Sequence, residues 1–528
     1  MLVTDLFPVC EIGILMFKRA IYFTLKPSIP LLFLLFMISV YRTLTLEIPH
    51  VDTPISLSEE LLEELKSPSS QTARLERLSQ ALQLRVISTE EPPPPEDTEQ
   101  MIQWLHREFP EVSRQLTWIK VGQSVVIIWD PPRAQSLFPP ILALAHFDVV
   151  PAGDDWLHPP HSGLITENEV WGRGALDDRS AVVAWFEALT LHLRLGTQLN
   201  RSFVLALDHD EEVGGLGALA MREWLETWLS QQPRGHQSFA WALDEGGYLT
   251  EGIIPNIQGS RAIVGIAEKG HLTLDVTLSG ESGHASMPPK ITTIGALSVL
   301  LSRLEQSSLP IRIDGAAALS MRWLAPDLPL LQRWALSNLW LTQPVVERIY
   351  ESKPSTAALI KTTTAITQLN AGDKYNRLAA SSHAVINFRL IPGDTPDTIQ
   401  TLISTRLQTW LDELEVEYSL NITARPAAGT PSRVSAVTGP ESEGWRLLQR
   451  SLRTSHPSAR VVPNLTIGAT DSRHFAEIVK QTYRFRPLSL TPQDLGRIHG
   501  SNERILKDDY HGLVHFFVAY LTGLARPK

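Results

Sequence analysis

Histidine and carboxylate residues follow three short apolar runs of the sequence, at the point where each run stops. They are His146 with Asp148 after residues 141–145, the segment DHDEE (208–212) after residues 203–207, and Asp244 with Glu245 after residues 239–243. Imidazole nitrogen and carboxylate oxygen are ligands of zinc and other divalent cations. The chain has one cysteine, Cys10, so an internal disulfide framework or a thiolate metal site is excluded. A metal site in this protein would use histidine and carboxylates.

The three apolar runs are typical of short strands buried in a sheet. Stretches with helical periodicity follow the first two, at residues 180–195 and 217–229. Strands that alternate with helices predict a largely parallel sheet, and ligand sites lie at the carboxyl ends of such strands. One aspartate after a strand is usually a helix cap, whereas three sets of polar residues at one edge predict a site. Two glycine-containing segments add Asp177, in WGRGALDDR, and His499, in RIHGSNERI.

The composition limits the classes of protein to which the chain can belong. Of its 528 residues, 43% are hydrophobic and 20% are charged, which is ordinary for a globular protein with a large core. The length favours two compact units and a tail. The formal net charge is −10 and no basic block stands out, so no nucleic-acid partner is expected.

Residues 29–41 (IPLLFLLFMISVY) are almost wholly apolar and have basic residues on both sides. The uncharged stretch 27–41 is shorter than the ~20 residues of a comfortable membrane helix, so a buried core helix or a signal peptide is the alternative. No small-x-small cleavage pattern follows the run, which favours an uncleaved anchor. We expect residues 1–46 to form a cytoplasmic tail and single-pass membrane anchor and residues 47–75 a tether. The catalytic domain would then lie on the non-cytoplasmic side, whether periplasmic, lumenal or extracellular.

The middle of the chain predicts a second domain. Residues 271–280 alternate apolar and polar side chains, as a half-exposed strand does. Helical and strand patterns then follow at 294–304, 384–390, 398–414 and 416–422. We expect a catalytic domain at residues 76–260 and 428–528 and an inserted domain at residues 261–427, with an extra helical segment at roughly 310–374. The tryptophans of that segment fit core packing better than a lipid or acyl-chain surface.

Six motifs in order resemble one family of enzymes. They are ALAHFDVVP, GRGALDDR, DEEVGG, ALDEGG, GESGHASMPP and IHGSNE. Together they resemble the co-catalytic zinc metallopeptidase family of aminoacylase and carboxypeptidase G. The segments IAEKGHLTLDV and TDSRHF are most similar to its branch of carboxypeptidase S and the N-fatty-acyl-amino-acid synthase/hydrolase. The resemblance implies an α/β fold: a zinc-peptidase catalytic domain with a mostly parallel sheet flanked by helices, and an inserted, ferredoxin-like α/β lid domain.

The resemblance also implies roles for the residues of the expected metal site. Two Zn²⁺ ions per chain are expected, one bound by His146 and Asp244 and the other by Glu212 and His499, with Asp177 bridging them. Asp148 would orient the imidazole of His146, and Glu211 would act as general base. The peptide bond between Asp177 and Asp178 is expected to be cis.

In the lid, the resemblance assigns substrate contacts to His284, Arg389 and Asn376. His284 would stabilise the oxyanion and Arg389 would bind the substrate carboxylate. Asn376 departs from the family pattern, because Arg377, Leu378 and Ala379 follow it where the family often has x-Ile-Pro.

The function implied is a metal-dependent hydrolase for the amide bond of dipeptides or peptides with a free C-terminus, or of N-acyl amino acids, and the reaction could run in reverse. The expected partners are a substrate with a free carboxylate, a membrane, and a second copy bound through the lid. The alternative is a membrane-tethered binding protein of the same fold without turnover. The complete set of candidate residues favours the enzyme.

Overall fold

The structure is a computed structural model that describes residues 30–48, 53–131, 138–232, 236–425 and 434–526. The chain divides into two compact units. One comprises Met1–Pro49 and Met321–Ile349, and the other comprises His50–Ser320 and Tyr350–Lys528. Every candidate site residue named above belongs to the second unit.

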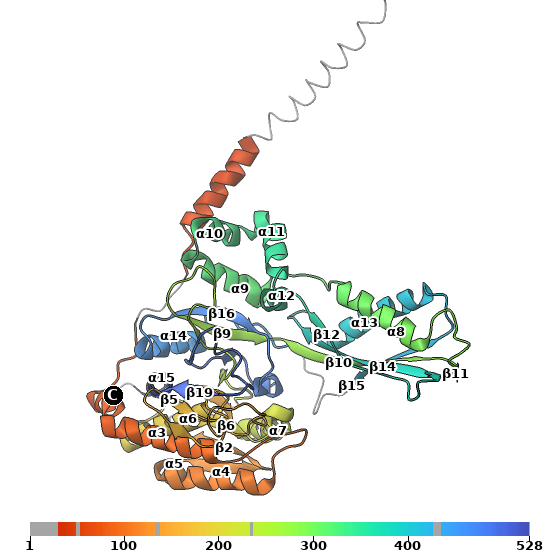
Figure 1. The fold of residues 1–528 in the computed structure, drawn as a ribbon. Coiled ribbons are helices and arrows are strands. Elements are labelled where there is room, and N and C mark those ends of the chain that lie inside the picture. Colours follow the sequence, from red (N-terminus) through yellow and green to blue (C-terminus); the bar gives the residue numbers. More distant parts are fainter. Residues whose placement is uncertain (1–29, 49–52, 132–137, 233–235, 426–433, 527–528) are drawn as a thin grey trace, which may run out of the picture. The chain divides into compact units, whose positions relative to one another are not determined.

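A ten-stranded mixed sheet forms the centre of the second unit (Figure 1). Its strands are β1 (Thr117–Val121), β2 (Ser124–Trp129), β3 (Ile141–His146), β6 (Phe203–Asp208), β7 (Ala242–Asp244), β8 (Leu249–Thr250), β9 (Arg261–Glu268), β16 (Arg460–Thr466), β17 (Thr482–Arg484) and β18 (Ser489–Leu490). The order is β1-β2-β6-β3-β7-β17-β9-β8-β18, with β16 paired to β9. The central strands β6, β3, β7 and β17 are parallel, so their carboxyl ends share one edge.

Helices cover both faces of this sheet, and the strands β3 and β6 are buried along their whole length. The helices are α4 (Pro95–Glu108), α5 (Pro110–Gln115), α6 (Arg179–Arg194), α7 (Leu216–Ser230), α14 (Glu443–Ser455) and α15 (Lys507–Gly523). On one face, Leu142 and Val204 pack with Met221 of α7. On the other, Trp185 of α6 contacts Phe203 and stacks on Phe517 of α15, with ring centroids 3.7 Å apart. The predicted α/β class with a mostly parallel sheet flanked by helices is confirmed.

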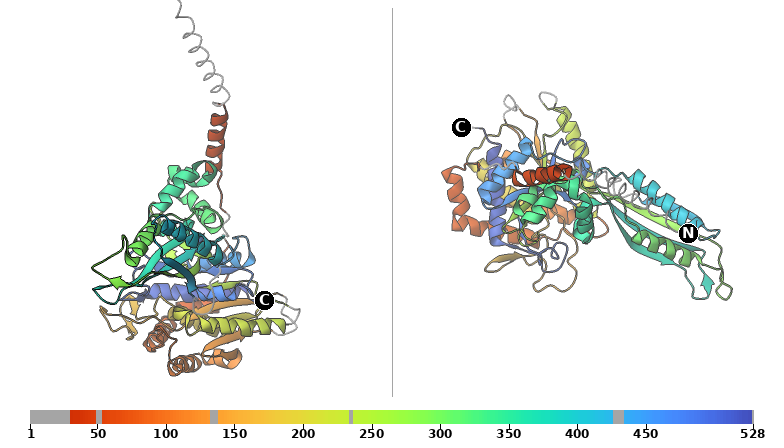
Figure 2. Two further views of the ribbon diagram at one scale, coloured as in Figure 1. Left: turned by 90° about the vertical axis from the view of Figure 1, so that its right-hand side faces the viewer. Right: turned by 90° about the horizontal axis from the view of Figure 1, so that it is seen from above.

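The lid is an antiparallel four-stranded sheet with two helices (Figure 2). Its strands, in the order β12-β14-β10-β15, are β12 (Thr363–Ala371), β14 (Ser381–Leu390), β10 (Gly270–Ser279) and β15 (Ser419–Arg425). Burial alternates along β10 as the sequence predicted. Its buried Leu274 and Val276 pack with Leu300 of α8 (Thr293–Gln306) and Ile403 of α13 (Pro396–Asp412). The lid therefore has an apolar core of its own.

In the first unit, a helix over residues 30–44 makes polar contacts with α10 (Leu330–Ser337) and with Asn338, which joins α10 to α11 (Leu339–Glu351). Trp334 Nε1 donates to Ser39 Oγ at 2.9 Å. Asn338 Nδ2 donates to the Ser39 carbonyl oxygen at 3.1 Å and to Thr43 Oγ1 at 3.0 Å. The unit also contains η3 (Ala325–Asp327) and the end of α9 (Gly315–Leu324), while α12 (Pro354–Ile360) belongs to the second unit.

Within the described residues, no helix combines the length and the apolar character needed to cross a membrane. The predicted localisation through a single-pass membrane anchor is therefore wrong for the described residues. The cytoplasmic tail and anchor were predicted for residues 1–46. Of these, residues 1–29 lie outside the described part of the chain.

The segment predicted as a tether, residues 47–75, is largely helical. It contains α2 (Glu59–Lys66) and the beginning of α3 (Pro68–Gln83). Leu61 and Leu65 of α2 are buried four residues apart, and Leu75 and Leu78 of α3 are buried three residues apart, so each helix has an apolar face. The domain boundary expected at residue 76 falls inside α3.

Candidate metal centre

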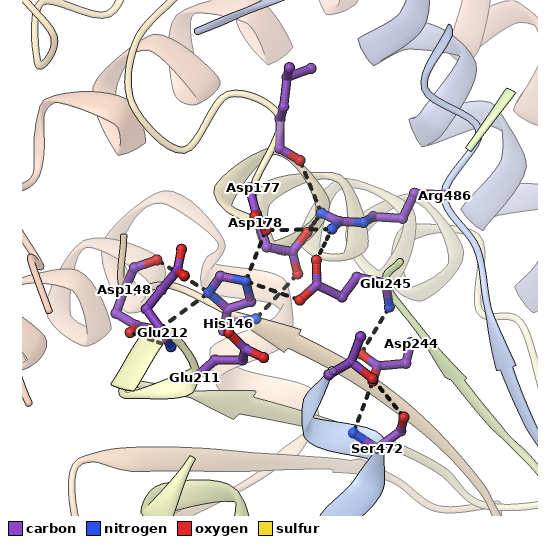
Figure 3. A network of polar contacts seen from close by, with 12 residues as sticks. His146, Asp148, Asp177, Asp178, Glu211, Glu212, Asp244, Glu245, Ser472 and Arg486 are labelled. Carbon is purple, nitrogen blue, oxygen red and sulfur yellow. Dashed lines mark hydrogen bonds and ion pairs between the residues drawn. The ribbon is translucent and has the colours of Figure 1, made fainter. Parts of the chain in front are cut away.

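The parallel strands bring three predicted groups together at one edge of the sheet (Figure 3). His146 is the last residue of β3, and Asp244 is the last residue of β7. Glu211 and Glu212 lie in η2 (Glu211–Val213), a short 3-10 turn that follows β6. Because β3 lies between β6 and β7, its terminal histidine has carboxylates on both sides.

Two loops complete the group, and a buried ion pair joins them. Asp177 follows β5 (Glu169–Trp171) and His499 precedes β19 (Arg504–Leu506), and the two strands pair in a small sheet with β4 (Leu164–Ile165). Glu503 Oε1 accepts hydrogen bonds from the backbone N–H groups of Leu176, at 2.7 Å, and Asp177, at 3.1 Å. Its other oxygen pairs with Arg173, which also donates to the His499 carbonyl oxygen at 3.2 Å.

The peptide bond between Asp177 and Asp178 is cis, as predicted.

Two clusters of ligand atoms share Asp177. In the first, His146 Nε2 lies 3.1 Å from Asp177 Oδ1 and 3.3 Å from Glu245 Oε1. In the second, His499 Nε2 lies 3.2 Å from Asp177 Oδ2 and 3.1 Å from Glu212 Oε2. Asp177 thus presents one carboxylate oxygen to each cluster.

Glu245 takes the place in the first cluster that the sequence analysis assigned to Asp244. The two oxygens of Asp244 accept hydrogen bonds from backbone N–H groups, Oδ1 from Glu245 at 2.8 Å and Oδ2 from Ser472 at 3.0 Å. Ser472 belongs to η4 (Asp471–Phe475), within the motif TDSRHF. The Asp244 carboxylate therefore holds η4 against the end of β7, and the Glu245 carboxylate faces His146.

Asp148 and Glu211 also border the cluster. The Nδ1 of His146 lies 3.2 Å from the Asp148 carbonyl oxygen and 3.3 Å from Asp148 Oδ1. The other oxygen, Asp148 Oδ2, accepts from Ser88 Oγ at 2.6 Å and from the backbone N–H of Glu212 at 3.2 Å. Glu211 lies with His146 and Glu245 in a group whose ligand atoms are all within 4.8 Å of one another.

The electrostatics of the group reflect an excess of buried carboxylates. Burial, and then the neighbouring Glu212 and Asp177, raise the pKa of Glu211 to about 8. Hydrogen bonds to Asp177 and Glu212 raise the pKa of His499 to about 10. Such shifts arise where negative charges gather without enough positive charge.

The donor set fits divalent metal ions. Two imidazoles and several carboxylates converge within ligand distance of one another, and no thiolate is required. Glu212 Oε1 is buried and has no hydrogen-bond partner in the described part of the chain, so it can turn to a cation.

The three predicted substrate-binding residues lie on the lid. His284 is exposed, on β11 (Gly283–His284), and contacts Ser286 Oγ at 2.7 Å. The Asn376 carbonyl oxygen accepts from the backbone N–H of Ala285 beside the same two-stranded sheet, in which β11 pairs with β13 (Arg377–Leu378). Arg389 lies on β14 opposite His271. Across the described residues, no hydrogen bond or ion pair connects these three to the two ligand clusters.

Sequence reasoning missed Glu245, Glu503 and Arg486 as members of the centre. Glu245 lies in the motif ALDEGG and Glu503 in the motif IHGSNE. The sequence therefore pointed to both segments but did not show which of the adjacent polar residues belongs to the centre. Arg486 stands in none of these motifs, and the packing of β17 beside β7 brings it to the centre.

Comparison with known proteins shows the family to which the chain belongs. The chain matches the peptidase family M20/M25/M40 over residues 142–523, and it belongs to this family. It is therefore a metal-dependent hydrolase of amide bonds, and the resemblance found in the sequence is confirmed.

Particular relatives lie in the expected branch. The chain is 39% identical to the mouse N-fatty-acyl-amino acid synthase/hydrolase PM20D1 over 73% of its length and 74% of the relative. It is 33% identical to the probable carboxypeptidase S-like 2 of Dictyostelium discoideum, over 78% of this chain and 76% of that one. Human carnosine dipeptidase 1 shares the fold, with a TM-score of 0.61, 15% identity and coverage of 89% of this chain and 99% of that chain.

Proposed function

We propose that this protein hydrolyses the amide bond of N-acyl amino acids at a centre of two zinc ions. The observation that supports it is the pair of ligand clusters that share Asp177, one oxygen to each. The relative with 39% identity acts, by its name, on N-fatty-acyl amino acids, which favours this substrate class. Peptides with a free C-terminus are the second class, because another relative is named as carboxypeptidase S-like.

In this proposal, His146, Glu245 and Asp177 hold one zinc ion, and Glu212, His499 and Asp177 hold the other. Asp244 is left out of the ligand set because Glu245, and not Asp244, faces His146, while the Asp244 carboxylate accepts from backbone N–H groups. When bound, the ions polarise the scissile carbonyl and lower the pKa of a water molecule.

The protein's own residues supply the proton transfers and the orientation. Glu211 accepts a proton from the attacking water and delivers it to the leaving amine, a role for which a carboxylate beside the ligand clusters is suited. Asp148 fixes the ring of His146 through Nδ1. Because the same groups serve both directions, the centre also catalyses condensation when acid and amino acid are abundant.

We further propose that Arg389 binds the substrate carboxylate, that His284 stabilises the oxyanion, and that Asn376 supports the two-stranded sheet that carries His284. Arg389 is partly buried and near Arg473, and this second positive charge makes the region attractive to an anion. His284 lies exposed on β11 of the lid. It therefore acts either after closure of its own lid or in a second copy bound through the lid.

The test is a panel of N-acyl amino acids of increasing acyl length, dipeptides, and the C-terminal amides of both, assayed with metal-free and zinc-loaded protein. Zinc-dependent cleavage of the free acids is expected, with faster turnover of the acyl amino acids. Glu211→Gln should keep the metal and lose most of kcat, whereas Glu212→Gln should lose metal as well. Equal cleavage of acids and amides would rule out recognition of the carboxylate.

A further inference from the structure

Arg486 reaches the metal centre from the strand next to β7. Arg484, the last residue of β17, is paired with Asp244, the last residue of β7, in parallel register. The chain continues with a hydrogen bond from the Arg486 N–H to the Gly247 carbonyl oxygen at 2.8 Å. Arg486 and Glu245 therefore leave the sheet side by side, and the Arg486 side chain is only 9% exposed.

The guanidinium of Arg486 binds several groups of the centre at once (Figure 3). Nη1 donates to the Leu176 carbonyl oxygen at 3.2 Å and forms an ion pair with Asp178 Oδ1. Nη2 forms an ion pair with Glu245 Oε2 and lies 3.7 Å from Asp177 Oδ1. A planar fork can make these contacts simultaneously, whereas the point charge of a lysine cannot.

The contact with Glu245 separates the roles of its two oxygens. Oε2 is held by Arg486, and Oε1 lies 3.3 Å from His146 Nε2. The two carboxylate oxygens of Asp178 also have different partners. Oδ1 faces Arg486, and Oδ2 accepts from the backbone N–H of His146 at 3.2 Å. Arg486 thus fixes both carboxylates that flank His146.

We propose that Arg486 is a positioning residue that leaves Glu245 one free oxygen for a cation and so keeps a coordination position open for substrate. This rests on the proposed function. With both oxygens free, the carboxylate can turn to present both to the cation, because carboxylates bind cations through either one or two oxygens. The cation bound by the first cluster, His146, Asp177 and Glu245, would then have one more oxygen ligand from the protein. It would have less room for the carbonyl oxygen of the substrate.

The experiment uses the full chain, stripped of metal and loaded with Co²⁺, whose visible absorption weakens as its coordination number rises. Arg486→Met should bind Co²⁺ and show an absorption lower by roughly twofold, because an oxygen ligand is added. The kcat for an N-acyl amino acid should fall about tenfold while KM changes by less than about threefold. Arg486→Lys should change both in the same direction, and it replaces the Met variant if that variant does not fold.

The matched control is Arg484→Lys, two residues earlier. Arg484 is also buried, with 1% of its side chain exposed, but its guanidinium pairs with Glu268 at 3.0 Å. Its Co²⁺ spectrum and kcat should equal those of the unmodified chain. Unchanged spectra in both Arg486 variants would overturn the inference about Arg486. Failure of the unmodified chain to take up Co²⁺ would instead overturn the proposed metal centre itself.

Discussion

Asp244 and Glu245 are adjacent acids with different surroundings, and this difference can be tested. Glu245→Gln should remove a charged donor from the first cluster, so that the protein retains about one metal ion and loses activity by ~100-fold. Asp244→Asn should keep both ions, because it only replaces an acceptor of backbone N–H groups, and should lower the free energy of unfolding by about 1–3 kcal/mol. Metal analysis and thermal denaturation of both variants check this. Loss of metal from Asp244→Asn alone would contradict it.

The sequence predicts most of this centre but does not decide between neighbours in it. His146, Asp177, Glu212 and His499 come together as expected, because each follows or precedes a strand whose pairing is regular. The choice between Asp244 and Glu245 depends on where β7 stops, since side chains alternate in direction along a strand. A shift of one residue exchanges the two acids, and no pattern in the sequence fixes it.

At the scale of elements, the contacts of Asn338 hold the helix over residues 30–44. Its Nδ2 donates to Ser39, Thr43 and Trp334, and the side chain is buried. Asn338→Ala should remove the hydrogen bonds to Ser39 and Thr43, leave the one from Trp334, and weaken the docking of the helix by about 1–3 kcal/mol. Hydrogen exchange should then be faster in residues 30–44. Gln343→Ala, on the exposed side of α11, is the control, and equal exchange in both variants would argue against this role.

A second prediction at this scale concerns the contact between α6 and α15. His192 of α6 is buried, with Nε2 2.9 Å from the Val518 carbonyl oxygen of α15. Burial lowers its pKa to about 4. The unfolded chain binds this proton near pH 6.5, so the stability from the neutral ring is complete above pH 6.5 and is lost as pH falls toward 4.

The loss amounts to at most about 3 kcal/mol. Denaturant unfolding at pH 7.5 and pH 4.5 measures it, and in His192→Gln the difference between the two pH values should shrink by that amount. An unaltered pH dependence in the variant would show that the ring does not titrate as inferred.

The elements themselves were predicted unevenly. The strands β3 and β6 and the helices α6 and α7 were predicted within a few residues, because their apolar patterns are regular. The hydropathy of the N-terminal apolar run predicts an anchor. It does not reveal that Ser39 and Thr43 are buried against Asn338. The residues that make these polar contacts are 295 positions apart in the sequence, so no local sequence pattern predicts them.

At the scale of the whole molecule, the position of His284 can be tested by mixing two inactive variants. Glu211→Gln has an intact lid and His284→Ala has an intact metal centre. If a lid serves the partner in a dimer, random mixing after dissociation should restore about one quarter of the activity, because half the dimers gain one complete site. If each lid closes on its own centre, mixing restores nothing. Metal content must stay unchanged in His284→Ala.

The strand β17 has a further consequence, for the order in which the protein folds during synthesis. It lies between β7 and β9 in the large sheet, yet it begins only at Thr482. The lid strands pair with one another and leave the ribosome earlier, so they can fold while β7 and β9 still have unpaired edges. Exposed edges of this kind bind other chains. A chain that is terminated before β17 would thus have a folded lid and a large sheet in which β7 and β9 keep unpaired edges. Such a chain would tend to aggregate.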